Sequence, residues 1–373
     1  MKYSKKVITL LIVLMTALLI SSCTNVGAAS SWPGYTVDDG VGYLSFGAQT
    51  YAIDISNGSL QWQYPAESDR TRQAYGAPQV LDGLVVFGDY ANKLVAVNAA
   101  NGTEKWKFSG AQDRYIASVE LTESFVFAPN TDGYIYALNS DGAMEWKFRT
   151  EGPNWTKPIA DEEFIYFASM DHNMYAISQT YNVSSLELAK DGSRTLRGDY
   201  AWKTDLGMAI VADPILQNGV LYSATIEGKL FAIEIETGEI LWSFDNNGEL
   251  GAVWGSPVID GSIIFIADTE GDVYTVDKDT GKQIWPSPFN AGGKIVGGGA
   301  LTPDGVVFAT DGGKIFLINQ EKEAKTIISL ESAIYAPVIN EERKILIAPA
   351  SEDGLLTAFD LEGFEVWSFV PSK

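Results

Sequence analysis

The sequence predicts an all-β protein, an eight-bladed β-propeller whose blades are four-stranded antiparallel sheets. The first observation behind this prediction is a repeat of roughly 41 residues, the usual spacing of propeller blades. The second is that β-branched and aromatic runs alternate with Asp/Gly turns inside each repeat, which indicates antiparallel hairpins. Seven of the ten tryptophans in the 373-residue chain end such a repeat, namely Trp62, Trp106, Trp146, Trp202, Trp242, Trp285 and Trp367.

The repeat at residues 257–285 shows the four expected strands. It reads Pro-Val-Ile-Asp-Gly, Ser-Ile-Ile-Phe-Ile-Ala, Asp-Val-Tyr-Thr-Val-Asp and Lys-Gln-Ile-Trp, with glycine-rich turns between the runs. One such sheet cannot bury both of its faces alone, so like sheets must pack around a common axis.

Eight of these units fit between Trp32 and Lys373. Their third strands lie near residues 51, 95, 136, 175, 231, 274, 316 and 357. The seventh unit has Ile327 in place of tryptophan and lacks the turn glycine, and the fourth carries an insertion at 178–201 between its third and fourth strands. A loop of that length on a regular scaffold is more often functional than decorative, and it is expected on the face opposite the inner-strand starts.

The repeat tryptophans are interpreted as spacers between blades. A buried indole removes ~150 to 250 Å² of surface from water, so it can fill the wedge between neighbouring sheets. We therefore expect the contact made by Ile327 to be weaker than the contacts made by the tryptophans.

The repeat also resembles a known family. The sequence Thr275-Val-Asp-Lys-Asp-Thr-Gly-Lys-Gln-Ile-Trp285, and its counterpart at 232–242, are similar to the pyrroloquinoline-quinone-type (PQQ-like) propeller repeat. The resemblance covers the chain after its leader, and it implies the propeller fold. It leaves activity open, because the repeat serves both quinoprotein dehydrogenases and non-enzymatic proteins. In length, blade count and anchoring, the chain is most similar to a lipoprotein of the outer-membrane barrel assembly machinery.

The first residues have the pattern of a lipoprotein leader. Three lysines precede an apolar run at 7–20, and Ser-Ser-Cys23 follows at once. This order resembles the bacterial lipoprotein cleavage box, which implies lipidation of Cys23 and export to a bacterial membrane. The alternative is an uncleaved membrane helix that ends at a cysteine. The predicted domains are a signal peptide at 1–22, a lipidated tether at 23–31 and one propeller at 32–373.

Residues that carry common enzyme chemistry are scarce. Cys23 is the only cysteine, so no internal disulfide can form, whereas the resemblance implies a vicinal disulfide and a longer chain in quinoproteins that oxidise alcohols. His172 is the only histidine and falls at a predicted hairpin tip, so we interpret it as a turn residue. Asp89, Asn130 and Asp268 share one column after second strands and could bind a cation, but turn chemistry explains them better. We expect no catalytic residue, no metal and no cofactor.

The charge of the chain restricts its partners. The net charge is −22, and removal of the three leader lysines leaves −25. Nucleic acid and anionic lipid surfaces are therefore poor partners for the domain itself.

When the repeats are aligned, one position before the inner strands is aromatic in four of them. Aligned on the inner-strand proline, Tyr75, Trp155 and Trp254 lie three residues upstream, and Tyr115 holds the same place before Ser118. Val211 and Ile334 fill the column elsewhere, with Tyr335 beside Ile334. We hypothesise that the four aromatic residues form a collar at the channel mouth that binds an extended peptide or a small ligand. The alternative is that they pack together and close the channel. Three arginines are expected on adjacent loops, namely Arg70, Arg72 and Arg114.

Two functions of different classes follow. The first is a non-enzymatic, membrane-anchored scaffold that binds envelope proteins or extended peptides as a monomeric domain. The second is a small quinoprotein-like oxidoreductase or a ligand-sensing propeller that uses the channel mouth.

Overall fold

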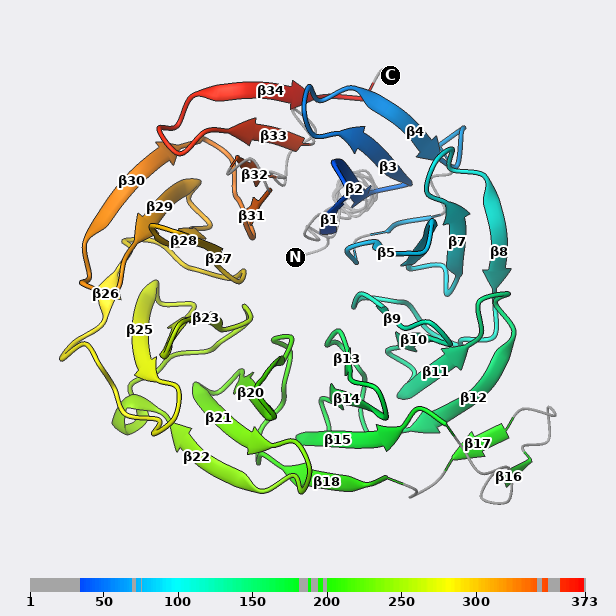
Figure 1. Ribbon diagram of the computed structural model, residues 1–373, viewed down its shortest axis with the longest axis horizontal. Helices are drawn as coiled ribbons and strands as arrows, with labels where there is room; N and C mark the ends of the chain where they lie inside the picture. The colour runs from blue at the N-terminus through cyan, green and yellow to red at the C-terminus, as the bar shows by residue number, and fades with distance from the viewer. Residues whose placement is uncertain are drawn as a thin grey trace, which may run out of the picture. The chain divides into compact units, whose positions relative to one another are not determined.

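The protein forms a ring of eight sheets around one axis (Figure 1). The structure is a computed structural model that describes residues 34–68, 72–74, 76–180, 187–188, 194–196, 200–340, 344–347 and 356–371. Pro33–Lys373 forms one compact unit. Seven sheets have four antiparallel strands and one has six, so the predicted eight-bladed propeller is confirmed. No helix within the described ranges is long and apolar enough to cross a membrane.

The blades follow one another along the chain, and each begins with its innermost strand. Blade 1 contains β1 (Gly34–Asp38), β2 (Val41–Phe46), β3 (Gln49–Asp54) and β4 (Leu60–Tyr64). Blade 2 contains β5 (Gln79–Leu81), β6 (Leu84–Gly88), β7 (Leu94–Asn98) and β8 (Glu104–Phe108). Blade 3 contains β9 (Glu120–Leu121), β10 (Val126–Pro129), β11 (Tyr134–Leu138) and β12 (Met144–Arg149). Blade 4 contains β13 (Ile159–Ala160), β14 (Phe164–Ala168), β15 (Asn173–Ser178) and β18 (Trp202–Asp205).

The second half repeats this order. Blade 5 contains β19 (Ile215–Gln217), β20 (Val220–Thr225), β21 (Lys229–Glu234) and β22 (Ile240–Phe244), followed by the short helix η2 (Asn246–Gly248). Blade 6 contains β23 (Val258–Asp260), β24 (Ile263–Ala267), β25 (Asp272–Asp277) and β26 (Phe289–Asn290). Blade 7 contains β27 (Ala300–Thr302), β28 (Gly305–Ala309), β29 (Lys314–Ile318) and β30 (Ala324–Ser329). Blade 8 contains β31 (Val338–Ile339), β32 (Ile345–Ile347), β33 (Leu356–Phe359) and β34 (Glu365–Phe369).

The repeat tryptophans join neighbouring blades, as the sequence predicts. Six of the indoles reach the turn of the next blade, where they donate their Nε1 hydrogen to a backbone carbonyl at 2.7 to 3.1 Å. Where the turn contains a glycine, its φ is positive and the ring lies against it. A Cβ added to Gly142, for example, would lie 2.5 Å from the ring of Trp106. The glycine is required both by the left-handed backbone and by the close approach of the indole.

Two blades depart from the repeat. In blade 6 the predicted outer strand ending at Trp285 is interrupted. Gln283 forms an isolated bridge with Val276, and the paired strand resumes at Phe289–Asn290. Pro286 and Pro288 lack the amide hydrogens that this strand would need. In blade 7 Ile327 is buried in the place of the tryptophan, and Lys322 takes the left-handed conformation at φ 69° in the turn that lacks glycine.

Within the part of the chain that the structure describes, the ring closes without an exchanged strand. Blade 1 consists only of β1 to β4, and blade 8 only of β31 to β34. Trp367 of blade 8 donates its Nε1 hydrogen to the carbonyl of Ile55 at 2.8 Å, and the Tyr35 hydroxyl of blade 1 donates to the carbonyl of Ala336 at 2.8 Å. Tyr35, Ile55 and Trp367 belong to one core shared by the first and the last blade.

The insertion leaves blade 4 and joins blade 3. Strands β16 (Glu187–Leu188) and β17 (Arg194–Leu196) come from the predicted insertion between β15 and β18. Strand β17 pairs in parallel with the outer edge of β12, so that sheet gains two strands. An outer blade edge in this molecule therefore accepts an added strand.

Candidate binding site at the propeller axis

The segments that lead into the inner strands alternate between buried and partly exposed residues. Before β13, Asn154, Thr156 and Pro158 are buried, whereas Trp155 and Lys157 are partly exposed. Successive residues of an extended chain point to opposite sides, so the buried set packs between blades and the other set faces the axis. Figure 1 shows the inner strands arranged around that axis.

The predicted collar is wrong at Tyr115. This residue is fully buried in the core between blades 2 and 3, and a Cβ on Gly88 would lie 2.2 Å from the Tyr115 Cβ. Strand β9 begins at Glu120, so Val119 rather than Ser118 corresponds to the inner-strand proline. That shift of one residue places Ile116 in the axial column and turns Tyr115 to the opposite side.

In blade 8 the residue three places before Pro337 is Ile334, but burial rather than this spacing places its neighbour Tyr335 on the axial side. Ile334 is fully buried, whereas Tyr335 is partly exposed. A Cβ added to Gly297 of blade 7 would lie 2.1 Å from the Tyr335 carbonyl oxygen, so the two inner segments are in close contact.

The two predicted tryptophans remain in the column. Trp254 is 39% exposed, which makes it the most accessible tryptophan at the axis. Trp155 is partly buried, and its Nε1 atom is covered but has no hydrogen-bond partner within the described residues. Tyr75 lies outside the described residues. We call Trp155, Trp254 and Tyr335 the aromatic column.

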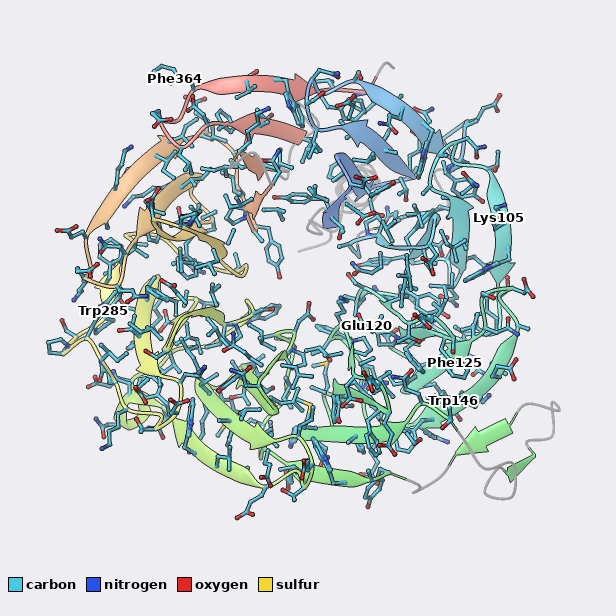
Figure 2. The ribbon with its side chains drawn as sticks, in the orientation of Figure 1. Lys105, Glu120, Phe125, Trp146, Trp285 and Phe364 are labelled. Atoms are coloured by element: carbon cyan, nitrogen blue, oxygen red, sulfur yellow. The ribbon has the colours of Figure 1, made fainter. Side chains whose placement is uncertain are left out.

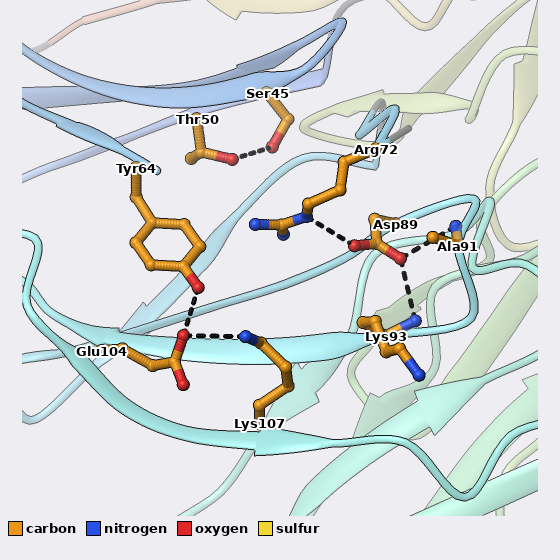
Figure 3. Close-up of polar contacts among 9 residues, drawn as sticks. All are labelled: Ser45, Thr50, Tyr64, Arg72, Asp89, Ala91, Lys93, Glu104 and Lys107. Atoms are coloured by element: carbon orange, nitrogen blue, oxygen red, sulfur yellow. Dashed lines mark hydrogen bonds and ion pairs between the residues drawn. The ribbon is translucent and has the colours of Figure 1, made fainter. Parts of the chain in front are cut away.

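The predicted arginines do not join this site. Arg70 lies outside the described residues. Arg72 donates its Nε hydrogen to the fully buried Asp89 at 2.9 Å, and its guanidinium lies 5.1 Å from the centre of the Tyr64 ring (Figure 3). Because Asp89 holds it, Arg72 stabilises the contact between blades 1 and 2 and is not available to a ligand. Arg114 is exposed and stacks on the ring of Tyr90 at 5.4 Å.

The same region contains a second link between blades 1 and 2. The Tyr64 hydroxyl donates to Glu104 of β8, and the Lys107 ammonium lies 3.0 Å from the same carboxylate (Figure 3). The hydrogen bond from Tyr64, together with Lys107, lowers the pKa of the Glu104 carboxyl. These contacts serve the fold rather than a binding site.

The polar column after the second strands consists of turn residues, as predicted. Asp89 Oδ1 accepts the backbone hydrogens of Ala91 and Lys93 at 2.9 and 2.8 Å. Asp268 accepts two turn hydrogens in the same way, and Asn130 accepts one and donates to a carbonyl. His172 lies in a turn with a φ of 76°.

Three charged residues at the axis were not predicted. The Lys157 ammonium lies 2.9 Å from a carboxylate oxygen of Glu120, and the Lys157 backbone donates its hydrogen to Asp213 Oδ1 at 2.7 Å. Figure 2 shows Glu120 at the inner end of its blade. We call Glu120, Lys157 and Asp213 the axial charge cluster. The available signal was that Lys157 and Asp213 each precede an inner-strand proline.

Burial changes the acidity of the Asp213 carboxyl. It raises the pKa of the Asp213 carboxyl to about 6, although the hydrogen bond and the charge of Lys157 oppose the shift. Burial also raises the pKa of the Tyr335 hydroxyl to about 12, and the charge of Asp213 adds to that shift. The charge of Asp213 in blade 5 therefore reaches the Tyr335 hydroxyl of blade 8.

Comparison with known proteins identifies the family. The sequence profile of the family described as "Outer membrane protein assembly factor BamB" matches residues 22–118, 193–294 and 269–373, more than half of the chain. The chain belongs to the BamB family. The predicted resemblance to a PQQ-like propeller related to BamB is thereby confirmed.

Individual BamB relatives are distant. BamB of Xanthomonas campestris pv. campestris is 27% identical over 209 residues, which cover 53% of this chain and 50% of the relative. BamB of Escherichia coli K12 is 22% identical over 226 residues, which cover 47% of this chain and 57% of the relative. A tetrathionate hydrolase of Acidithiobacillus ferrooxidans is 25% identical over 211 residues, which cover 52% of this chain and 40% of the hydrolase. The chain thus spans about half the length of the curated relatives it matches.

A solved structure supports the fold. The crystal structure of BamB from Moraxella catarrhalis superposes with a TM-score of 0.68 at 17% identity, and the match covers 87% of this chain and 92% of that chain.

The axial residues do not fit a quinone cofactor with calcium. Calcium takes six to eight oxygen ligands. Within the described residues, no group of three or more His, Cys, Asp or Glu side chains could hold a metal ion. The two carboxylates of the axial charge cluster, Glu120 and Asp213, are separated by Lys157, which contacts both.

Proposed function

We propose that this protein is a non-enzymatic, membrane-anchored scaffold of the bacterial envelope that binds envelope proteins and contributes to outer-membrane protein assembly. The match to the BamB family over most of the chain carries this proposal. The charge of the chain is consistent with protein partners, since an acidic surface disfavours nucleic acid.

The outer strands offer surfaces suited to protein partners. Strand β34 is the edge strand of blade 8, and Phe364, Val366 and Val370 next to and within it are 72%, 45% and 57% exposed. Val366 and Val370 alternate with the buried Trp367 and Phe369, so these two share the outward side of the strand. Figure 2 places Phe364 on the outer rim. The pairing of β17 with β12 shows that a blade edge can accept a further strand.

In-cell cross-linking tests the scaffold role. Cross-linked complexes are captured from native membranes and their proteins identified. We expect outer-membrane proteins or their assembly machinery, and a lower yield when Phe364 and Val366 are replaced by Ser and Thr. Replacement of Leu301, an apolar residue of blade 7 that is 46% exposed, by Ser is the matched control. Equal yields from both variants would show that β34 does not contact the partner. The absence of outer-membrane assembly proteins from the complexes would refute the scaffold role itself.

Lipidation of Cys23 is part of the proposal. Metabolic labelling with a palmitate analogue should label the wild-type protein and leave Cys23→Ala unlabelled and released from the membrane. A membrane-bound Cys23→Ala protein would favour the uncleaved helix instead.

Similarity to a tetrathionate hydrolase supports an enzyme or ligand sensor as the second candidate. Purified protein is assayed for tetrathionate hydrolysis, and for a visible absorbance band after addition of the quinone and calcium. Turnover or a band would favour this candidate, whereas a colourless, inactive protein favours the scaffold.

A further inference from the structure

The axial charge cluster contains a carboxylate without a full counter-ion. The Lys157 ammonium pairs with Glu120 at 2.9 Å, so only the Lys157 backbone hydrogen reaches Asp213, at 2.7 Å on Oδ1. No hydrogen bond to Asp213 Oδ2 occurs among the described residues. The cluster therefore carries one net negative charge when Asp213 is ionised.

The aromatic column belongs to the same ring of inner segments as this carboxylate. A Cβ added to Gly255, which follows Trp254, would lie 2.3 Å from the carbonyl carbon of Gly297, and one added to Gly297 would lie 2.1 Å from the carbonyl oxygen of Tyr335. In blade 5 the column position is held by Val211, two residues before Asp213. Residues two apart in an extended chain lie on the same side of it, roughly 7 Å from each other. Trp254 is 39% exposed. The charge of Asp213 contributes to the raised pKa of the Tyr335 hydroxyl. Aromatic faces attract cations, and they also pack against the apolar stem of a long side chain.

We propose that the axial charge cluster and the aromatic column together bind the cationic side chain of an arginine or lysine on an extended peptide. The head group pairs with Asp213, and the stem lies along Trp254 and Tyr335. The overall charge of −22 attracts cationic segments toward the ring. This inference rests on the proposed scaffold function, to which it adds the chemical class of the bound segment.

A peptide pair of equal shape tests the role of charge. The probes are a seven-residue peptide of Gly, Ser and Ala with one central arginine, and the same peptide with citrulline, the neutral isostere of arginine. Binding to the purified propeller is followed by tryptophan fluorescence and by calorimetry. We expect saturable binding of the arginine peptide and about tenfold weaker binding of the citrulline peptide, because a charge-assisted hydrogen bond is lost. Equal affinities, or no saturable binding, would overturn the proposal.

Variants locate the site. Asp213→Asn keeps the acceptor for the Lys157 backbone hydrogen and should weaken the arginine peptide about tenfold. Asp304→Asn, at an exposed turn of blade 7, is the matched control and should bind as the wild type does. Trp254→Ala should weaken binding about threefold through loss of the cation–π contact. An Asp213→Asn protein that is folded by circular dichroism and binds normally would place the peptide elsewhere and contradict the inference.

A further binding measurement distinguishes a site for a peptide side chain from a site for a free small cation. N-acetyl-arginine amide should bind more weakly than the arginine peptide, since it lacks the flanking backbone. Equal affinity would show that the site takes small cations and would overturn the peptide assignment. If Asp213→Asn loses peptide binding but cells keep normal outer-membrane protein assembly, the scaffold function stands without this site. If peptide binding is normal while assembly does not depend on the protein, the scaffold function fails and the site remains.

Discussion

Removal of the indole that closes the ring, by Trp367→Ala, should destabilise the propeller by about 4 kcal/mol. Trp367 is buried and donates to the Ile55 carbonyl at 2.8 Å across a separation of 312 residues. At ~25 cal/mol per Å², loss of ~150 to 200 Å² of contact corresponds to about 4 to 5 kcal/mol, and the lost hydrogen bond adds about 1 kcal/mol. Relaxation around the cavity recovers part of this sum, and measured costs for such truncations are about 3 to 5 kcal/mol.

Urea unfolding followed by circular dichroism measures this loss. A lower midpoint at an unchanged slope reports a change in stability alone. Trp254→Ala is the matched control, because this ring is 39% exposed and its removal should cost about 1 kcal/mol or less. If Trp367→Ala is no more harmful than Trp254→Ala, the indole does not close the ring and the explanation of the repeat is wrong.

Three further predictions concern the repeat and the axis. Lys322→Gly should leave stability within about 1 kcal/mol of the wild type, because relief of the φ of 69° is opposed by loss of the Nζ hydrogen bonds to Ser287 at 3.0 and 3.1 Å and of the contact with the Trp285 ring; a larger shift of the urea midpoint would contradict this. Gly142→Ala should lower stability by about 2 kcal/mol or more, because its Cβ would lie 2.5 Å from the ring of Trp106; a thermal melt within 1 °C of the wild type, roughly the error of such melts, would refute the contact. Asp213 has a folded pKa of about 6, raised from 3.8, so the wild type should lose stability as pH rises from 4 to above 6. The loss is at most about 3 kcal/mol, and Asp213→Asn should abolish it; parallel curves of melting temperature against pH would show that Asp213 contributes nothing.

The blade count could be predicted because its signals are local. In blades 1, 2, 3, 5 and 8 the turn glycine, the repeat tryptophan and the third-strand alanine lie within a dozen residues of one another, and the alanine pairs directly with the tryptophan, as Ala52 does with Trp62. The interruption of the outer strand in blade 6 also has a local signal in Pro286 and Pro288. The prediction followed the repeat tryptophan before them and therefore extended the outer strand to Trp285.

The axial site was less predictable for physical reasons. The column was assigned by alignment on proline, and blade 3 has Val119 in that place, so a slip of one residue put Tyr115 on the wrong side. The axial charge cluster joins side chains from three blades, and the contact between Lys157 and Asp213 spans 56 residues. Sequence periodicity does not specify which charges meet across an axis.

The most direct test of the central claim is the amount of folded outer-membrane protein in cells that lack this protein. It is measured as the fraction that keeps its compact, heat-sensitive mobility on a gel. We predict that the fraction falls in the deletion strain and recovers with the wild-type gene but not with Cys23→Ala. An unchanged fraction, together with enzymatic turnover by the purified protein, would contradict the scaffold role.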